Sequence, residues 1–149
     1  MRIYLDNCCY NRPYDDQSQM RINLDTQAKL YIQLMIKDKK IELVTSYVLD
    51  FENSKNRVIQ KKLAISTFME ENESYYVGEE RQNEIRTMVR QIMATGVKEK
   101  DAAHVACAIY AKSDYFITTD DRLLKYISDQ VKILTPGEFI REIEVKANE

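Results

Sequence analysis

Four acidic residues stand where alternating strands and helices could gather them. Asp6 ends the first strand-like run, Glu52 lies about two helical turns beyond the second, and Asp120 directly follows the third. Asp101 stands at the start of an unusually apolar helical segment. Carboxylates brought together repel one another and lose hydration, so their pKa values rise unless a cation neutralises them. Asp6, Glu52, Asp101 and Asp120 are therefore a candidate catalytic and metal site.

These residue types indicate which metal and which chemistry to expect. Oxygen ligands without a His or Cys partner favour Mg²⁺ or Mn²⁺ over zinc. Mg²⁺ keeps several of its waters, so a few carboxylates suffice to hold it. A bound water can attack a phosphodiester while the metal offsets charge that develops on the phosphate. Each acid also has an ordinary alternative as a turn residue, a helix cap or a solvated helix position.

Short runs rich in β-branched or aromatic residues predict four strands, separated by segments of helical periodicity. The predicted strands span 2–5, 40–45, 115–118 and 131–134. The predicted helices span about 22–37, 46–53, 58–69, 79–94, 100–112 and 120–127. This alternation predicts an α/β fold whose parallel sheet is covered on both faces. The length of 149 residues suits a single domain over 1–149.

The helical segments differ in how their apolar residues are arranged. Over 22–37, one predicted face carries Leu24, Ala28, Tyr31 and Met35. Over 79–94, the stripe is Ile85, Met88, Val89, Ile92 and Met93, with Gly96 as the stop. The stretch 102–111 is apolar nearly all the way round, which predicts a buried helix. Its His104 is then expected to be a satisfied buried partner, with metal ligand or general base as alternatives.

Strand order predicts where the acids meet. Ligands of open parallel sheets bind beyond the carboxyl ends of the strands. Asp6, Glu52 and Asp120 fall near that edge. Asp101 begins the helix that leads into the third strand, so chain order puts it at the opposite end of that connection. Only a bent or closely packed helix start would bring it to the others.

Composition excludes several classes of protein. A net charge of −2 counts against a protein that holds duplex nucleic acid on a broad basic surface, although a nuclease needs only a local basic approach. No run is long enough to span a membrane and the first residues lack a signal-peptide stretch, which predicts a cytoplasmic protein with no membrane partner. Cys8, Cys9 and Cys107 lack the spacing of a zinc site or disulfide framework. A semi-buried thiol is expected at Cys8 or Cys9, with a catalytic cysteine as the alternative.

Four blocks of the sequence resemble the PIN-domain family, which includes the VapC-like toxins of bacterial toxin–antitoxin pairs. In the family's order and spacing they are Tyr4-Leu5-Asp6, Thr45-Ser46 through Glu52, Asp101-Ala102-Ala103-His104-Val105-Ala106 and Ile117-Thr118-Thr119-Asp120. The resemblance runs from Arg2 to about Leu134. The D-A-x-H-x-A block followed by I-T-T-D is its specific part.

This resemblance implies a three-layer α/β/α PIN-like fold with a central parallel sheet. It also implies Mg²⁺- or Mn²⁺-dependent cleavage of single-stranded RNA by a homodimer, with a cognate antitoxin as a partner if the chain is a toxin. By position, Asp6, Glu52, Asp101 and Asp120 match the family's acidic quartet. In that family the helix start equivalent to Asp101 reaches the site.

Two further acids stand beside the quartet. Asp50 is two residues from Glu52, so on a helix the two point to different sides. The spacing from Ser46 favours Glu52. Asp121 either assists Asp120 or belongs to the first turn of a helix.

The residues after Asp6 depart from the commoner family pattern, in which Thr or Ser follows the first Asp. Asn7 could replace that hydroxyl as a hydrogen-bonding neighbour of Asp6. Arg12 could contact a substrate phosphate or form an ion pair with Asp15 or Asp16.

Other polar side chains have roles left open between substrate binding and ordinary structure. Thr118 and Thr119 could bond a ligating carboxylate or a phosphate, or be plain strand residues. The basic residues that could approach RNA or form a solvated helix face are Lys55, Arg57, Lys61, Lys62, Arg86 and Arg90.

Two other functions compete with the nuclease. A catalytically silent PIN-like module that binds RNA or protein is one, and the presence of all four acids counts against it. A receiver-like signalling domain is the other. It would need paired acids at the first strand end, where Asn7 follows Asp6, and an acid at the end of a middle strand, where Thr45-Ser46 stands.

Overall fold

A five-stranded sheet, parallel throughout, forms the centre of the protein in a computed structural model that describes residues 1–149. The strands are β1 (Arg2–Leu5), β2 (Glu42–Ser46), β3 (Glu73–Val77), β4 (Tyr115–Ile117) and β5 (Lys132–Leu134). Their order across the sheet is β3-β2-β1-β4-β5, so β1 is central. Ile3 of β1 pairs with Leu43 on one side and Tyr115 on the other. The prediction of a parallel sheet is confirmed.

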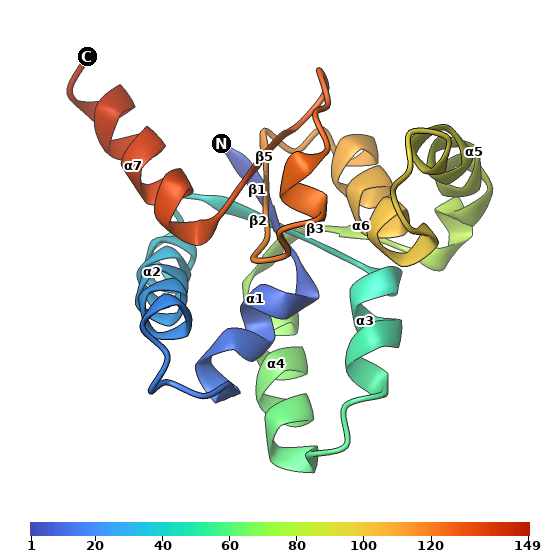
Figure 1. Cartoon of the computed structure of the whole chain (residues 1–149). Helices are drawn as coiled ribbons and strands as arrows, with labels where there is room; N and C mark the ends of the chain where they lie inside the picture. The colour runs from blue at the N-terminus through green and yellow to red at the C-terminus, as the bar shows by residue number, and fades with distance from the viewer.

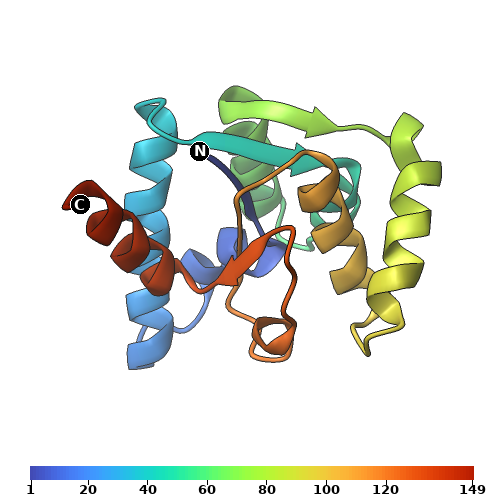
Figure 2. The ribbon, with the colours of Figure 1, turned by 90° about the horizontal axis from the view of Figure 1, so that it is seen from above.

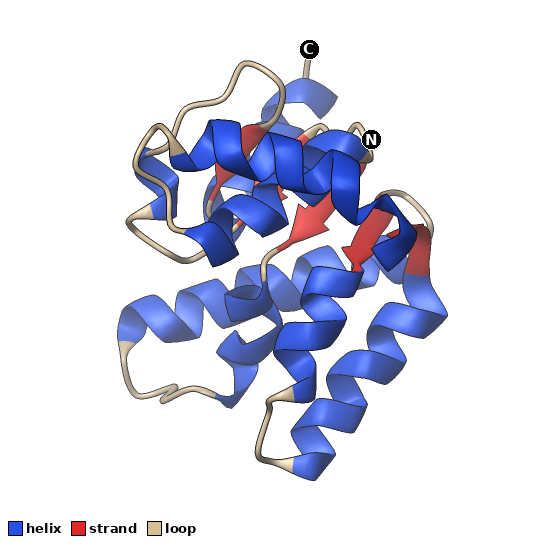
Figure 3. Cartoon of the chain, turned by 90° about the vertical axis from the view of Figure 1, so that its right-hand side faces the viewer, coloured by secondary structure: helices blue, strands red, loops and turns tan.

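Helices cover both faces of this sheet. They are α1 (Asn7–Asn11), α2 (Met20–Lys37), α3 (Tyr47–Ser54), α4 (Ile59–Asn72), α5 (Gln82–Met93), α6 (Glu99–Tyr110) and α7 (Pro136–Ala147). In Figure 1, α1 to α4 lie below the sheet and α5 and α6 above it. Figure 2 shows α7 beside α2, against which it packs. Figure 3 shows the strands between two helical layers, which confirms the predicted three-layer α/β/α arrangement.

The connections explain why two strand ends face a common crevice. The chain runs from β1 outward through β2 to β3, then returns to β4 on the other side of β1 and continues to β5. Right-handed crossovers in these two directions place their helices on opposite faces. The order therefore reverses between β1 and β4. The crevice beyond the carboxyl ends of these two strands is the point at which such sheets bind ligands.

The core joins the central strands to α6. The Tyr4 ring stacks on Phe116 at 5.2 Å between centroids, which locks β1 beside β4. The predicted burial of the apolar helix is confirmed, because Ala102 and every residue from His104 to Ala108 are buried in α6. In α5 the buried residues are Ile85, Val89 and Ile92 of the predicted stripe, whereas Met88 is half-buried and Met93 is exposed. Burial of this kind contributes roughly 25 cal/mol per Å² of apolar surface.

Helix boundaries follow from local caps. Ser46 begins α3 by accepting a hydrogen bond from the Leu49 amide at 3.2 Å, as predicted. Gly96 has φ of 104° shortly after α5, a backbone conformation that favours glycine. Thr135 and Glu138 form a reciprocal capping box that begins α7. None of the helices has both the length and the apolar character needed to cross a membrane.

Three elements were not predicted: helix α1, strand β3 and helix α7. Strand β3 continues directly from α4 and carries exposed tyrosines at the sheet edge. Two other local predictions were wrong. The predicted helix over 120–127 is only a short 3₁₀ turn, η3 (Leu123–Lys125). In α2 the buried face includes Ile32 and Ile36, whereas Leu24 and Tyr31 of the predicted face are exposed. Contacts with α7 and α1 decide that face, and helical periodicity alone does not identify it.

Candidate active site at the strand edge

Asp6 is the buried acid of the site, with 5% of its surface exposed at the carboxyl end of β1. Its Oδ2 accepts a hydrogen bond of 2.8 Å from the Thr118 hydroxyl, and its Oδ1 accepts one of 2.8 Å from the Asn7 amide. Asp6 therefore caps α1 as well as facing the crevice. The predicted hydrogen bond from Thr118 to an acid of the site is present. The half-buried thiol of Cys8 lies 3.4 Å from Oδ2 of Asp6.

Glu52 reaches the crevice from α3 and is held by three side chains. Its Oε1 lies 2.6 Å from His104 Nε2, and its Oε2 accepts a hydrogen bond of 2.6 Å from Asn7 Nδ2. Lys100 forms an ion pair with it at 3.3 Å. Burial raises the pKa of Glu52, but hydrogen bonds and charges from these partners outweigh burial and lower its pKa below the ordinary value. Glu52 is consequently held as a carboxylate.

His104 connects Glu52 to two buried hydroxyls. It is 1% exposed, and its Nδ1 lies 2.7 Å from the Tyr4 hydroxyl, which in turn lies 2.7 Å from Ser46 Oγ. The Glu52 carboxylate can only accept, so Nε2 of His104 carries the proton between them, and Nδ1 forms the second hydrogen bond with the Tyr4 hydroxyl. The prediction that His104 is a satisfied buried partner is confirmed.

Sequence reasoning missed three residues that support the site: Tyr4, Ser46 as a hydrogen-bond partner of Tyr4, and Lys100. The one usable signal was spacing, since Tyr4 and Asp6 are two residues apart and side chains at that spacing share a face of a strand. Burial raises the pKa of Tyr4, so its hydroxyl stays protonated and available as a donor.

Asp101 lies in the first turn of α6, where Lys98 is the N-cap residue. Burial raises the pKa of Asp101, and the negative charges of Asp6 and Asp120 raise it further. The helix start therefore brings Asp101 toward the other acids, although chain order alone put it at the far end of the connection. The alternative of Asp101 as an N-cap is excluded.

Asp120 follows β4 in a turn. Its amide donates to the Thr118 hydroxyl at 3.1 Å, and its Oδ1 accepts from the Arg122 amide at 2.9 Å. Asp120 therefore lies in a turn, and the alternative that it caps a helix is wrong, because the N-cap residue of the following 3₁₀ turn is Arg122. Thr118 joins the two strand ends, since the same hydroxyl that accepts from Asp120 donates to Asp6.

The acids share one edge but do not form a closed ligand cage. No three His, Cys, Asp or Glu side chains converge closely enough to hold one metal ion. Both oxygens of Glu52 accept hydrogen bonds from protein partners, and so do both oxygens of Asp6. The only ligand atoms that the four acids offer are carboxylate oxygens. That set suits Mg²⁺ or Mn²⁺, which keep several waters and need few protein ligands.

Neighbouring charged residues point away from the site. Asp50 accepts a hydrogen bond of 2.7 Å from the Tyr76 hydroxyl, so Glu52 is the acid of α3 that faces the crevice. Exposed Asp121 forms an ion pair with Arg21 at 2.6 Å.

Arg12 is also engaged elsewhere. It pairs with Asp25 at 3.1 Å and with Asp15 at 3.5 Å. The ion-pair interpretation of Arg12 is therefore confirmed, although its closer partner was not predicted.

Comparison with known proteins gives similarity in structure alone. No protein-family model matches the chain, and no curated protein matches its sequence. VapBC2 from Rickettsia felis, solved with a DNA fragment from its promoter, matches with a TM-score of 0.54 at 11% identity, over 89% of this chain and 97% of that one.

Two FitAB structures are similar as well. FitAcB from Neisseria gonorrhoeae matches with a TM-score of 0.54 at 16% identity, over 91% of this chain and 98% of that one. FitAB bound to the IR36 DNA fragment matches with a TM-score of 0.57 at 17% identity, over 90% and 94%. At these identities the likeness establishes the fold: the chain has the PIN-like fold of the VapBC and FitAB structures.

Proposed function

We propose that this protein is a metal-dependent endoribonuclease that cleaves single-stranded RNA. The observation that carries the proposal is the effect of neighbouring acids on the pKa of Asp101, at the sheet edge where β1 and β4 end. Burial and the charges of Asp6 and Asp120 raise the pKa of Asp101 in the absence of any neutralising side chain bonded to it. A folded protein that keeps such a group gains from binding a cation there.

The residues divide the work of hydrolysis between them. Asp6, Asp101 and Asp120 do not form a ready-made ligand group, and they would have to draw together to hold Mg²⁺ or Mn²⁺. The bound metal would supply a polarised water and offset charge on the phosphate. Asp6 is oriented by Thr118 and by the start of α1. Glu52 stays ionised beside His104 and adds negative charge to the site.

We also propose that the protein is the toxin of a toxin–antitoxin pair, acts as a homodimer in the cytoplasm and is inhibited by a cognate antitoxin. The VapC-like sequence blocks and the similarity to VapBC2 and FitAB support this role. Expression alone should arrest growth, and co-expression of a small DNA-binding protein from the adjacent gene should restore it. Normal growth on expression of an active ribonuclease would remove the toxin role and leave the enzyme.

Hydrolysis of a single-stranded RNA with Mg²⁺ or Mn²⁺ tests the enzyme. Asp6→Asn and Asp120→Asn should each slow cleavage on the order of 10³-fold, because several kcal/mol of metal-dependent stabilisation is lost. The matched control is Asp121→Asn, an adjacent acid that faces away from the site. Equal cleavage by all variants would refute the proposal.

The competing function is a silent PIN-like module that binds RNA or protein. Calorimetric titration with Mn²⁺ separates the two. A nuclease should take up Mn²⁺ in the wild type and lose that uptake in Asp6→Asn, whereas a silent module should show no carboxylate-dependent uptake.

A further inference from the structure

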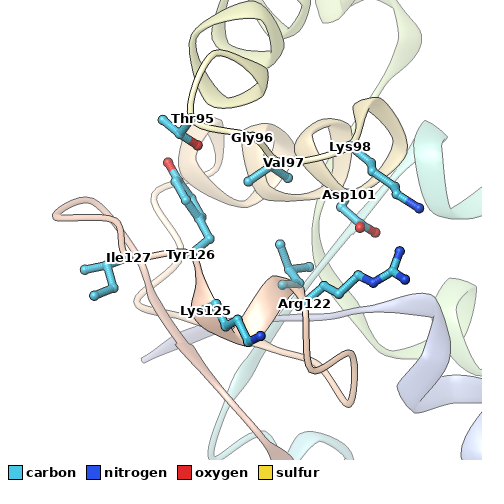
Figure 4. Close-up of a pocket in the computed structure, with 10 residues that line it drawn as sticks. Thr95, Gly96, Val97, Lys98, Asp101, Arg122, Lys125, Tyr126 and Ile127 are labelled. Atoms are coloured by element: carbon cyan, nitrogen blue, oxygen red, sulfur yellow. The ribbon is translucent and has the colours of Figure 1, made fainter.

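A pocket of about 490 Å³ opens beside the acidic edge, between the α5–α6 connection and the turn after β4. Asp101 stands at one end of it (Figure 4). The other residues that shape it include Val97, Lys98, Arg122, Leu123, Lys125 and Tyr126. The pocket therefore communicates with the site while lying outside the acid cluster itself.

Three cationic side chains surround this pocket. Lys98, Arg122 and Lys125 are exposed, and none of them forms an ion pair within the chain. Figure 4 shows the ends of Lys98 and Arg122 on the same side as the Asp101 carboxylate. In a chain of net charge −2, this is a local concentration of unpaired positive charge next to a cluster of acids. A polyanion that approaches those acids is repelled unless cations of this kind offset them.

The rest of the pocket is suited to a flat, partly apolar group. Val97 supplies apolar surface between the cations and Tyr126, which lies near Thr95 at the end away from Asp101 (Figure 4). Leu123 also lines the pocket. The Tyr126 ring is half-buried and stacks on no other ring of the chain. Aromatic side chains in this state are the usual platforms for unpaired bases.

We propose that this pocket binds one nucleotide of a single-stranded RNA, immediately next to the phosphate that is cleaved. Lys98 and Arg122 contact the backbone phosphates at the Asp101 end, Lys125 contacts the next phosphate, and the base lies over Leu123 against Tyr126. The inference rests on the proposed ribonuclease function and adds the position of its substrate. It also accounts for a preference for single strands, because a paired base is stacked within its duplex and cannot enter.

Binding of a fluorescein-labelled RNA oligonucleotide, measured by anisotropy in EDTA to prevent cleavage, tests the pocket. The triple variant Lys98→Ala/Arg122→Ala/Lys125→Ala should bind about tenfold more weakly or worse. Its slope of log K against log salt should fall by about 2, since each lost phosphate contact on a single strand removes about 0.7. The matched control is Arg86→Ala/Arg90→Ala on the exposed face of α5, which should change neither quantity.

The aromatic contact is tested separately. Tyr126→Ala should weaken binding about tenfold, and Tyr126→Phe should bind like the wild type because the stacking ring is retained. Thermal melting of each variant identifies any loss of folding. Loss of binding in both Tyr126 variants with intact folding would contradict a stacking role.

The outcomes separate this inference from the proposed function. The wild type could cleave RNA with metal while the triple variant keeps the same affinity and salt slope. That result would contradict RNA binding by the pocket and leave the ribonuclease function standing. Pocket-dependent RNA binding without any cleavage would overturn the enzyme and keep the pocket. An oligonucleotide that does not bind the wild type would overturn the pocket.

Discussion

The two halves of the acidic edge are built in opposite ways. In one half, Glu52 is enclosed by Asn7, Lys100 and a buried chain of hydrogen bonds through His104 to Tyr4. In the other half, Asp101 lines an open pocket and Asp120 lies in the turn after β4. The pKa of Glu52 is lowered by its partners, whereas the pKa of Asp101 is raised by burial and by like charges.

The difference shows which acid has its partners within the protein and which acid needs a ligand to provide one. The Glu52 half is satisfied within the protein, so its geometry exists before anything binds. In the other half no side chain forms an ion pair with Asp101, so a bound cation would stabilise both this acid and the protein. In a site of this type, the unpaired charge lowers the stability of the protein but serves its function.

The largest expected effect comes from Asp101→Asn. RNA cleavage should fall on the order of 10³-fold, while the free energy of unfolding at neutral pH should rise by about 0.5–2 kcal/mol. The folded pKa of Asp101 is raised, so its ionisation lowers stability as pH rises through that pKa. Below its ordinary value of 3.8 both states are protonated and the variant's advantage should disappear.

Urea unfolding of Asp101→Asn at several pH values without divalent metal measures this effect. A variant that is less stable than the wild type at neutral pH would contradict the contrast between the two halves.

The next effect is that of His104→Leu. This change leaves the Tyr4 hydroxyl and the Glu52 carboxylate without their buried partner, and should cost about 3 kcal/mol of unfolding free energy. Chemical denaturation measures it. Tyr4→Phe is the matched control and should cost less, about 1–2 kcal/mol, because the ring packing on Phe116 remains. Equal stability of His104→Leu and the wild type would mean that the hydrogen-bond chain does not support the fold.

A smaller effect is expected from Glu52→Gln. It should cost about 1–2 kcal/mol at neutral pH, because the charge-assisted bonds to His104 and Lys100 are lost. The folded pKa of Glu52 is lowered, so its contribution is full above the ordinary value of 4.5 and is lost as pH falls through the folded pKa. The difference between variant and wild type should therefore shrink in acid, when followed by urea unfolding across that range. A stability difference between Glu52→Gln and the wild type that grew in acid would contradict a lowered pKa of Glu52.

The smallest effect tests the boundary of the site. Arg21→Ala removes the partner of Asp121 in an exposed ion pair, so the free energy of unfolding should change little. Cleavage and Mn²⁺ uptake should be unchanged. A marked loss of cleavage would extend the functional edge to Asp121.

Local sequence patterns were enough to predict the strand ends. Asp6 and Asp120 follow β-type runs that became β1 and β4, and Ser46 became the cap that fixes α3 and so the direction of Glu52. The parallel α/β arrangement followed from alternation of elements. These features depend on neighbours a few residues apart, so periodicity, turn chemistry and capping preferences encode them.

Tertiary structure alone decided how the acids are divided and what surrounds them. Whether Asp101 reaches the edge depends on how α6 packs against α5 and the sheet, and the sequence supplied only a family resemblance for it. The contact between Tyr4 and His104 spans residues 100 apart in the chain, and the cationic pocket joins two loops from different connections. Pairings at such separations are set by the packing of whole elements, and local periodicity carries no record of them. The acids were therefore evident from the sequence, while the contrast between a satisfied Glu52 and an unsatisfied Asp101 emerged only in the folded chain.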